Sequence, residues 1–148
     1  MALLFIRWTK ENETGIPVID EQHRALAGII NSFFHFRDDP DIERVLVPTA
    51  EAMKDFGVIH FGTEEKLMLE SGYPGYEEHS REHLLIKEEI WMEERACRNA
   101  GDAMGFLLFL KKYWTKHLEG YDREYIPHLR KYFAELEAQK KDPKPGPA

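Results

Sequence analysis

Residues 60–83 read HFGTEEKLMLESGYPGYEEHSREH, and this stretch predicts two helices joined by a tight turn. Both ends of the stretch are rich in residues that favour helices, such as Glu, Leu, Lys and Met. Gly72, Pro74 and Gly75 separate them, because glycine favours the end of a helix and proline cannot continue one. Since the connection is short, the two helices are expected to be antiparallel neighbours.

Each of these two helices carries a pair of candidate metal ligands. His60 and Glu64 lie four residues apart before the turn, and His79 and His83 lie four apart after it. Residues four apart share nearly the same face of a helix, so each pair can address one point between the helices. Neutral imidazole is the commonest side-chain ligand for a transition metal. The two pairs therefore predict a metal site inside a helical bundle.

The rest of the chain predicts more helix and no strand. Apolar residues recur at spacings of three and four in four stretches, approximately 20–35, 41–71, 76–100 and 103–117. Asp20 is a candidate cap for the first helix, and the last resumes as a shorter helix to about residue 139 after interruptions at Gly120 and Pro127.

The predicted fold is therefore all-α. It is an antiparallel up-down-up-down four-helix bundle with an extended N-terminal arm and a short C-terminal helix. We expect an arm at residues 1–19, the bundle at residues 20–139 and a disordered tail at residues 140–148.

The first and fourth helices supply the remaining candidate ligands, His23 on the first and His117 with Asp122 on the fourth. On a straight α-helix His117 and Asp122 would lie about 140° apart. They can share one site only if the helix is distorted between them, for example by a bulge near Gly120. Every helix then contributes to one candidate ligand set, namely His23, His60, Glu64, His79, His83, His117 and Asp122.

The composition describes one soluble domain and disfavours several classes of protein. The 148 residues are 43% hydrophobic and 32% charged, with a formal net charge of −7. No apolar run approaches the ~20 residues that span a membrane, and the opening residues lack the pattern of a signal peptide, so we expect a cytoplasmic protein without membrane insertion. Lys and Arg are scattered among acidic residues, which disfavours nucleic-acid binding. Cys97 is the only cysteine, so the chain offers neither an internal disulfide nor a cluster of thiolate ligands.

These residues resemble the hemerythrin family, in its bacterial single-domain form. The resemblance extends from about Trp8 to Tyr125, and none of the family's seven ligand positions is vacant. The matching residues are Trp8, Thr14-Gly15-Ile16, Ile19-Asp20-Glu21-Gln22-His23, Asn31, His60-Phe61, Glu64-Glu65, Met68, Gly72-Tyr73-Pro74, His79-Ser80-Arg81-Glu82-His83, His117, Asp122 and Tyr125.

The resemblance implies a pair of iron ions (Fe²⁺/Fe³⁺) joined by an oxo or hydroxo group. It assigns three histidines to one iron, two to the other and both carboxylates to the bridge: His79, His83 and His117, then His23 and His60, then Glu64 and Asp122. These ligands fall one short of completing two octahedra. The resemblance therefore implies that O₂ binds reversibly, as peroxide, at the iron held by the two histidines.

The sequence departs from the family just before the histidine of the fourth helix. The family commonly has Trp-Leu four and three residues before this histidine, and the leucine lines the oxygen pocket; here these residues are Tyr113 and Trp114. Trp114 would lie about 60° around the helix from His117 and overhang the open position. It either narrows the pocket and alters access of oxygen or water, or merely fills a roomy core. Phe61 and Leu118 match apolar pocket positions of the family.

Three functions stay open at this point. The first is storage, delivery or buffering of O₂, with an oxygen-consuming enzyme or an electron donor as a further partner. The second is an oxygen or redox sensor, and the third is a di-iron enzyme that handles peroxide or nitric oxide. Five imidazoles with only two carboxylates favour the first over ferritin-like oxidases, whose sites are dominated by carboxylates and use a Glu-x-x-His motif that this sequence lacks. We therefore expect a binding protein without catalytic residues.

Overall fold

The computed structural model describes residues 4–142 and 145–147, and all regular secondary structure in this part of the chain is helical. The elements are a short 3₁₀ turn η1 (Lys10–Asn12), the helices α1 (Pro17–His35), α2 (Glu43–Ser71), α3 (Tyr76–Ala100) and α4 (Ala103–Tyr113), a π-helix η2 (Trp114–Tyr121), and α5 (Asp122–Lys141). The predicted all-α class is confirmed.

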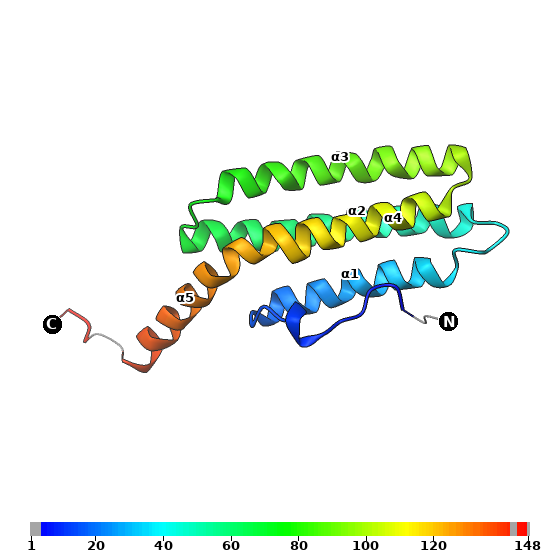
Figure 1. The fold of residues 1–148 in the computed structure, drawn as a ribbon. Helices are drawn as coiled ribbons and strands as arrows, with labels where there is room; N and C mark the ends of the chain where they lie inside the picture. Colours follow the sequence, from blue (N-terminus) through cyan, green and yellow to red (C-terminus); the bar gives the residue numbers. More distant parts are fainter. Residues whose placement is uncertain (1–3, 143–144, 148) are drawn as a thin grey trace.

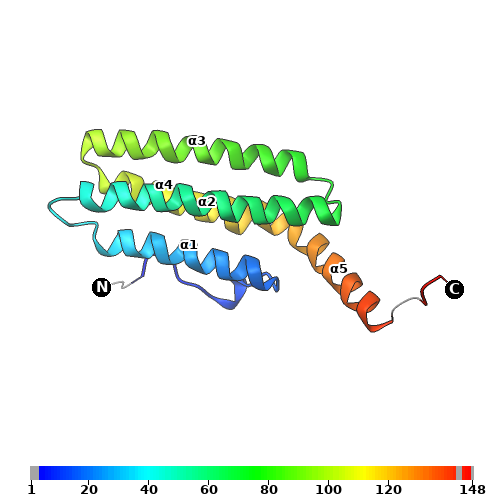
Figure 2. The same cartoon turned by 180° about the vertical axis from the view of Figure 1, so that it is seen from behind.

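The helices α1, α2 and α3 and the continuous α4–η2 segment run alternately up and down (Figures 1 and 2). α1 packs against α2, α2 against α3, α3 against α4, and α4 returns to α1. The segment before α1 runs along this helix, where the Asn31 side chain accepts hydrogen bonds from the backbone N–H groups of Phe5 and Ile6 and donates one to the Ile6 carbonyl. The up-down-up-down arrangement thus leaves the four inward faces directed at one another.

The tight turns that follow α2 and α3 each have a glycine where the backbone is left-handed. Gly72 ends α2 at φ 67° and Gly101 ends α3 at φ 62°, a left-handed conformation that glycine adopts without steric cost. After α2, the N–H of Tyr73 reaches back to the Met68 carbonyl at 2.8 Å. The turn predicted from residues 72–75 is present and places α2 and α3 side by side.

The start of the first helix differs from the sequence prediction. α1 begins at Pro17, so Asp20 lies inside its first turns and is not the cap. Proline suits this place because the first helical residue needs no N–H donor. The Asp20 carboxylate instead accepts hydrogen bonds from the N–H and hydroxyl of Thr14, both at 2.8 Å, and from the N–H of Gly15 at 3.2 Å. It fixes the corner where the arm joins the bundle.

The interruptions of the last helical stretch that were expected at Gly120 and Pro127 do not occur. Helical structure continues from α4 through η2 into α5, and only its geometry changes. Pro127 lies near the start of α5. Proline lacks a backbone N–H and its ring clashes with the preceding turn, so it bends a helix. α5 leaves the bundle at an angle (Figure 1) and reaches Lys141, and the parts of the predicted tail at 143–144 and 148 lie outside the described residues.

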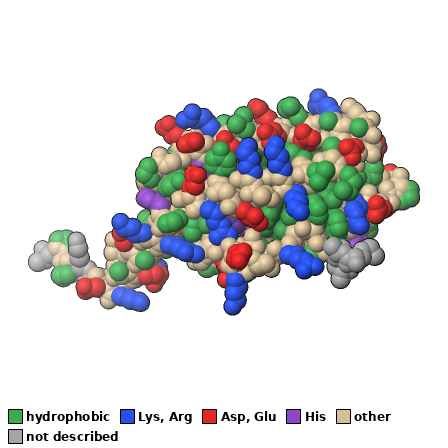
Figure 3. Space-filling model, viewed as in Figure 1, with side chains coloured by type: hydrophobic (Ala, Val, Ile, Leu, Met, Phe, Trp, Pro, Cys, Tyr) green, Lys and Arg blue, Asp and Glu red, His purple; other side chains and the backbone are tan. Residues whose placement is uncertain are grey.

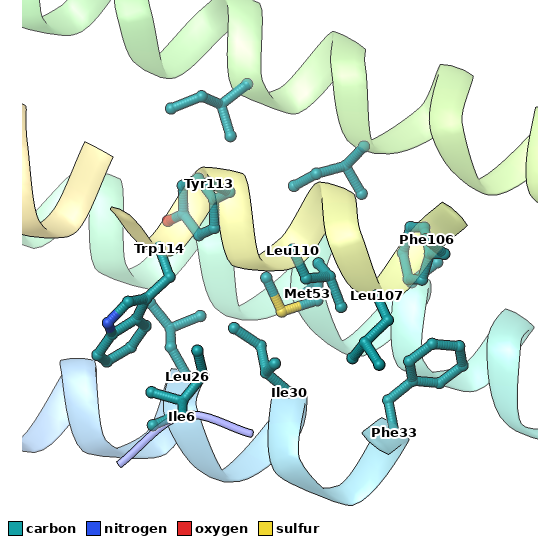
Figure 4. Packing of buried hydrophobic residues seen from close by; sticks show 14 of the residues in the cluster. Ile6, Leu26, Ile30, Phe33, Met53, Phe106, Leu107, Leu110, Tyr113 and Trp114 are labelled. Carbon is teal, nitrogen blue, oxygen red and sulfur yellow. The ribbon is translucent and has the colours of Figure 1, made fainter. Parts of the chain in front are cut away.

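The core consists of two apolar clusters with a polar layer between them. Figure 4 shows part of the larger cluster, in which side chains of α1, α2 and α4 meet. Along α1, Ile19 belongs to the smaller cluster and Leu26 to the larger, and His23 lies between these two in the sequence. Along α2, Glu64 likewise lies in the sequence between Phe61 of the larger cluster and Met68 of the smaller cluster. The candidate ligands are therefore enclosed by apolar side chains from both sides.

The outer surface carries both charge signs. Acidic and basic side chains are interspersed on the face shown in Figure 3. Among the described helices, none combines the length and the apolarity that crossing a membrane requires.

Leu107→Ala is expected to lower the free energy of unfolding by about 2–5 kcal/mol, because it leaves a cavity in the larger cluster. Leu107 is 0% exposed, and its neighbour Leu108 on the outer face is 58% exposed. Leu108→Ala is the matched control and should change stability by at most about 0.5 kcal/mol. Denaturant unfolding measures both, and equal losses would contradict the assignment of Leu107 to the core.

Candidate metal centre

The structure brings all seven predicted ligand side chains together in the polar layer. They are buried, and they form two overlapping groups within each of which the candidate ligand atoms lie within 4.8 Å of one another. The first group is Glu64, His79, His83, His117 and Asp122, and the second is His23, His60, Glu64 and Asp122. The two carboxylates are common to both groups.

Each carboxylate directs one oxygen toward each group of histidines. Oε1 of Glu64 is 3.1 Å from Nε2 of His60, and Oε2 is 3.1 Å from Nε2 of His83. Asp122 has the same arrangement on the other side. Its Oδ2 is 3.2 Å from Nε2 of His23, and its Oδ1 is 3.1 Å from Nε2 of both His79 and His117. The side chains thus divide into a three-histidine half and a two-histidine half, with the carboxylates between them.

A π-helix allows His117 and Asp122 to share the centre. η2 spans Trp114–Tyr121, and the N–H of Asp122 bonds to the carbonyl of His117, five residues earlier. In a π-helix, two residues separated by five positions in the sequence are separated by nearly one full turn, so the side chains of His117 and Asp122 both face inward. The predicted distortion of the fourth helix is confirmed, although it starts at Trp114 and is longer than a bulge at Gly120.

The buried polar atoms of the cluster fit the donor set of a metal centre. Nε2 of all five histidines, Oε2 of Glu64 and both oxygens of Asp122 have no hydrogen-bond partner. Several of these atoms approach one another within 4 Å, but not with hydrogen-bond geometry. Unpaired buried polar atoms are costly, and imidazole nitrogens with carboxylate oxygens are ligands for divalent transition metals. A cation placed within each of the two ligand groups would satisfy these atoms.

The charges in the cluster also attract cations. Burial opposes ionisation of Glu64, but the charges and close polar contacts of the surrounding histidines hold its pKa well below the usual range. Burial likewise opposes a charge on His23 and His79, yet Asp122 and Glu64 raise the pKa of each imidazole to about 9. Two buried anions thus demand positive charge, which either protons on the imidazoles or metal ions can supply.

Tyr125 supports one of the carboxylates directly. Its hydroxyl donates a hydrogen bond of 2.7 Å to Oε1 of Glu64, and the side chain is fully buried. Burial and the charges of Glu64 and Asp122 raise the pKa of Tyr125 well above its usual value, so the phenol keeps its proton as a donor.

Two residues that contact the ligands received no role from the sequence. Oε1 of Gln22 lies 2.9 Å from Nδ1 of His60, and Oε1 of Glu65 lies 2.8 Å from Nδ1 of His83. Gln22 is next to His23 in the sequence but contacts a histidine of another helix, and Glu65 is 18 residues from its partner. Since each contact joins two helices, only the packed bundle reveals it.

The three candidate pocket residues are all buried, and two of them contact the candidate ligands. The Phe61 ring stacks on His83 with 4.0 Å between ring centroids, and it is 5.7 Å from His60. The Trp114 ring lies 6.5 Å from His23. Leu118 belongs to the same apolar cluster as Phe61 and Trp114. Phe61 therefore borders both halves, whereas Trp114 borders the two-histidine half.

Trp114 is fixed by contacts from two directions. Its Nε1 donates a hydrogen bond of 2.8 Å to Glu119, and the Trp8 ring of the N-terminal arm meets it edge-on at 6.4 Å. The Arg24 guanidinium lies over Trp8 at 4.9 Å. The arm thus closes over the side of the bundle where Trp114 covers His23.

A cavity of about 150 Å³ reaches the other side of the centre. It lies between α3 and the α4–η2 segment and includes His117, Tyr113 and Tyr121 in its lining. The two remaining histidines lie elsewhere, since His35 is exposed and His128 contacts the Ser71 carbonyl at 2.8 Å.

Comparison with known proteins agrees with this geometry. A family model described as "Hemerythrin HHE cation binding domain" matches residues 14–129. This chain belongs to the hemerythrin family. Hemerythrins generally are oxygen-binding proteins with non-haem iron, and the resemblance found in the sequence is confirmed.

Several relatives match most of the chain. A bacteriohemerythrin of Stenotrophomonas maltophilia is 30% identical over 132 residues, which cover 88% of this chain and 84% of that protein. A bacteriohemerythrin of Pseudomonas paraeruginosa is 28% identical over 137 residues, covering 91% and 88%. A crystal structure of wild-type hemerythrin is similar with a TM-score of 0.72 at 22% identity, covering 84% of this chain and 98% of that one. The hemerythrin fold is therefore shown by an independent structural match.

Tyr125→Phe is expected to weaken metal binding about 10- to 100-fold, the usual effect of removing a residue that supports a ligand. The variant leaves the ring in place and removes only the hydrogen bond to Glu64. Tyr132→Phe, on the outer part of α5, is the matched control. Competition with a chelator of known affinity measures the difference, and equal affinities of the two variants would exclude a role for the Tyr125 hydroxyl.

Proposed function

We propose that this hemerythrin binds O₂ reversibly, for storage, delivery or buffering, at two iron ions with an oxo or hydroxo bridge. The observation that carries the proposal is the division of the cluster into three and two histidines that share two carboxylates. His79, His83 and His117 would hold one iron and His23 and His60 the other, with Glu64 and Asp122 between them. When bound, the iron pair supplies the two electrons that reversible O₂ binding requires.

The unequal number of histidines supports a particular place for O₂. Glu64 and Asp122 each offer one oxygen to either half, so the carboxylates do not distinguish the halves. The half with His23 and His60 has one imidazole fewer. That half is where we place O₂, consistent with the position of Trp114 next to His23.

The surroundings favour reversible binding because they keep water and protons away. Phe61, Trp114 and Leu118 are each at most 4% exposed, and the rings of Phe61 and Trp114 border the ligands with apolar surface. Burial, together with the charges of Asp122 and Glu64, raises the pKa of the Tyr113 hydroxyl well above its usual value. Tyr113 and Tyr125 therefore retain their protons, and a dry site limits the side reactions that water would start.

The first experiment is a spectrum taken under controlled oxygen. The chain loaded anaerobically with Fe²⁺ should be colourless, develop visible charge-transfer absorption on addition of O₂, and lose it again when O₂ is removed. Iron analysis should give two ions per chain. Immediate irreversible oxidation, or sustained turnover of peroxide or nitric oxide, would contradict the proposal and favour a di-iron enzyme.

The second experiment asks whether Trp114 controls access to the two-histidine half. Trp114→Leu should increase the rate of O₂ association and the rate of autoxidation, because a smaller side chain opens the side of the centre that the arm and Trp114 close. Trp91→Leu is the matched control, since Trp91 is an exposed tryptophan on α3. Stopped-flow absorption gives both rates, and unchanged rates in Trp114→Leu would show that this ring only fills space.

A further inference from the structure

The two halves of the centre differ in the number of histidines and also in the group that contacts Nδ1 of one histidine in each half. His60 belongs to the two-histidine half, and its Nδ1 contacts the side-chain amide of Gln22 at 2.9 Å. His83 belongs to the three-histidine half, and its Nδ1 contacts the carboxylate of Glu65 at 2.8 Å. One contact is to a neutral group and the other is to an anionic group.

The direction of both hydrogen bonds follows from the surrounding atoms. Nε2 of His60 and Nε2 of His83 each face Glu64 at 3.1 Å, so these nitrogens are the ones available to a metal ion. Nδ1 must then carry the proton of the neutral imidazole. Both imidazoles therefore donate a hydrogen bond from Nδ1.

The orientation of the Gln22 amide is fixed by a second contact. The Thr63 hydroxyl donates its proton to the Ile59 carbonyl at 2.9 Å, so it can only accept from Gln22, whose Nε2 is 2.9 Å away. The amide oxygen of Gln22 consequently faces His60. Gln22 is thus a fixed, neutral acceptor for this imidazole.

Glu65 is a stronger acceptor than Gln22. An ionised carboxylate forms shorter and stronger hydrogen bonds with N–H groups than a neutral amide does. A carboxylate that accepts from the far nitrogen of a ligating imidazole makes the imidazole more basic, which stabilises the more highly charged state of the metal ion. The Glu65 side chain is 26% exposed, so water screens part of its charge, but the His83 ring between it and the centre is fully buried.

We propose that Glu65 and Gln22 make the two halves electronically unequal, so that the three-histidine half takes the higher oxidation state when one iron of the pair is oxidised. This inference rests on the proposed iron pair. Its consequence is that the two-histidine half, where we place O₂, keeps the ferrous ion longer. Glu65 and Gln22 are positioning residues that act through His83 and His60.

Three variants test the proposal by changing charge with little change in shape. Glu65→Gln keeps an acceptor for His83 and removes the charge, Gln22→Glu adds a charge behind His60, and the double variant exchanges the two groups. Glu70→Gln is the matched control, because Glu70 is an exposed carboxylate of α2 that contacts Lys66 and no histidine. All are measured as the full chain loaded with two irons.

The reduced protein is titrated anaerobically with ferricyanide. In the first step one electron passes from the iron pair to the reagent, Fe²⁺ becomes Fe³⁺ and ferricyanide becomes ferrocyanide, and no bond to Glu65 or Gln22 breaks. Glu65→Gln should raise the midpoint potential of this step relative to the wild type and to Glu70→Gln. In the half-oxidised wild type, proton NMR should show a larger hyperfine shift for Nδ1–H of His83 than for that of His60, and the double variant should reverse this order.

Glu65→Ala separates the electronic role from a merely structural one. It should weaken metal binding about 10- to 100-fold, and Glu65→Gln should recover most of that loss while its potential stays shifted. A midpoint in Glu65→Gln equal to that of Glu70→Gln, or an unchanged NMR order in the double variant, overturns this inference and leaves the proposed function intact. A wild-type chain that does not load two irons overturns both.

Discussion

Two carboxylates buried in the middle of a helical bundle are the constraint on which the rest of this structure depends. Glu64 and Asp122 have no exposed surface, and an isolated buried charge costs far more than a domain of this size can sustain. Five imidazoles converge on them, and together these groups form a site that requires added positive charge. The apolar clusters on both sides exclude the water that would otherwise solvate the carboxylates.

The same constraint explains the unusual backbone of the fourth helix. A straight α-helix would turn Asp122 away from His117, and the centre would lose one of the two carboxylates that both halves share. The π-helix η2 turns both side chains inward, and it also places Trp114 against His23 and within hydrogen-bond distance of Glu119. Departures of this kind are frequent at functional sites, where they are retained for the geometry that they provide. Here one departure shapes both the ligand set and its cover.

Around the shared carboxylates, the centre is built asymmetrically. One half has three histidines, Glu65 behind His83 and a small cavity beside His117. The other half has two histidines, Gln22 behind His60, and a cover formed by Trp114 and the N-terminal arm. This asymmetry supports a different role for each half in the proposed function. Under the proposed function, the half with fewer ligands and the more enclosing cover would bind O₂, and the half with more ligands and a charged support would hold the iron that is oxidised first.

Local sequence spacing was enough to predict the helical bundle, the turn at residues 72–75 and the candidate ligand set, because a helix converts such spacing directly into shared faces. It also showed that the fourth helix has to be distorted, but not that the distortion is an extended π-helix. The sequence misplaced the start of the first helix, since the hydrogen bonds of Asp20 to Thr14 and Gly15 depend on how the arm folds back. The atoms that support the ligands became visible in the packed bundle alone. Gln22 with His60, Glu65 with His83 and Trp8 with Trp114 each join elements distant in sequence, and such contacts depend on the register of packed elements, which no local pattern encodes.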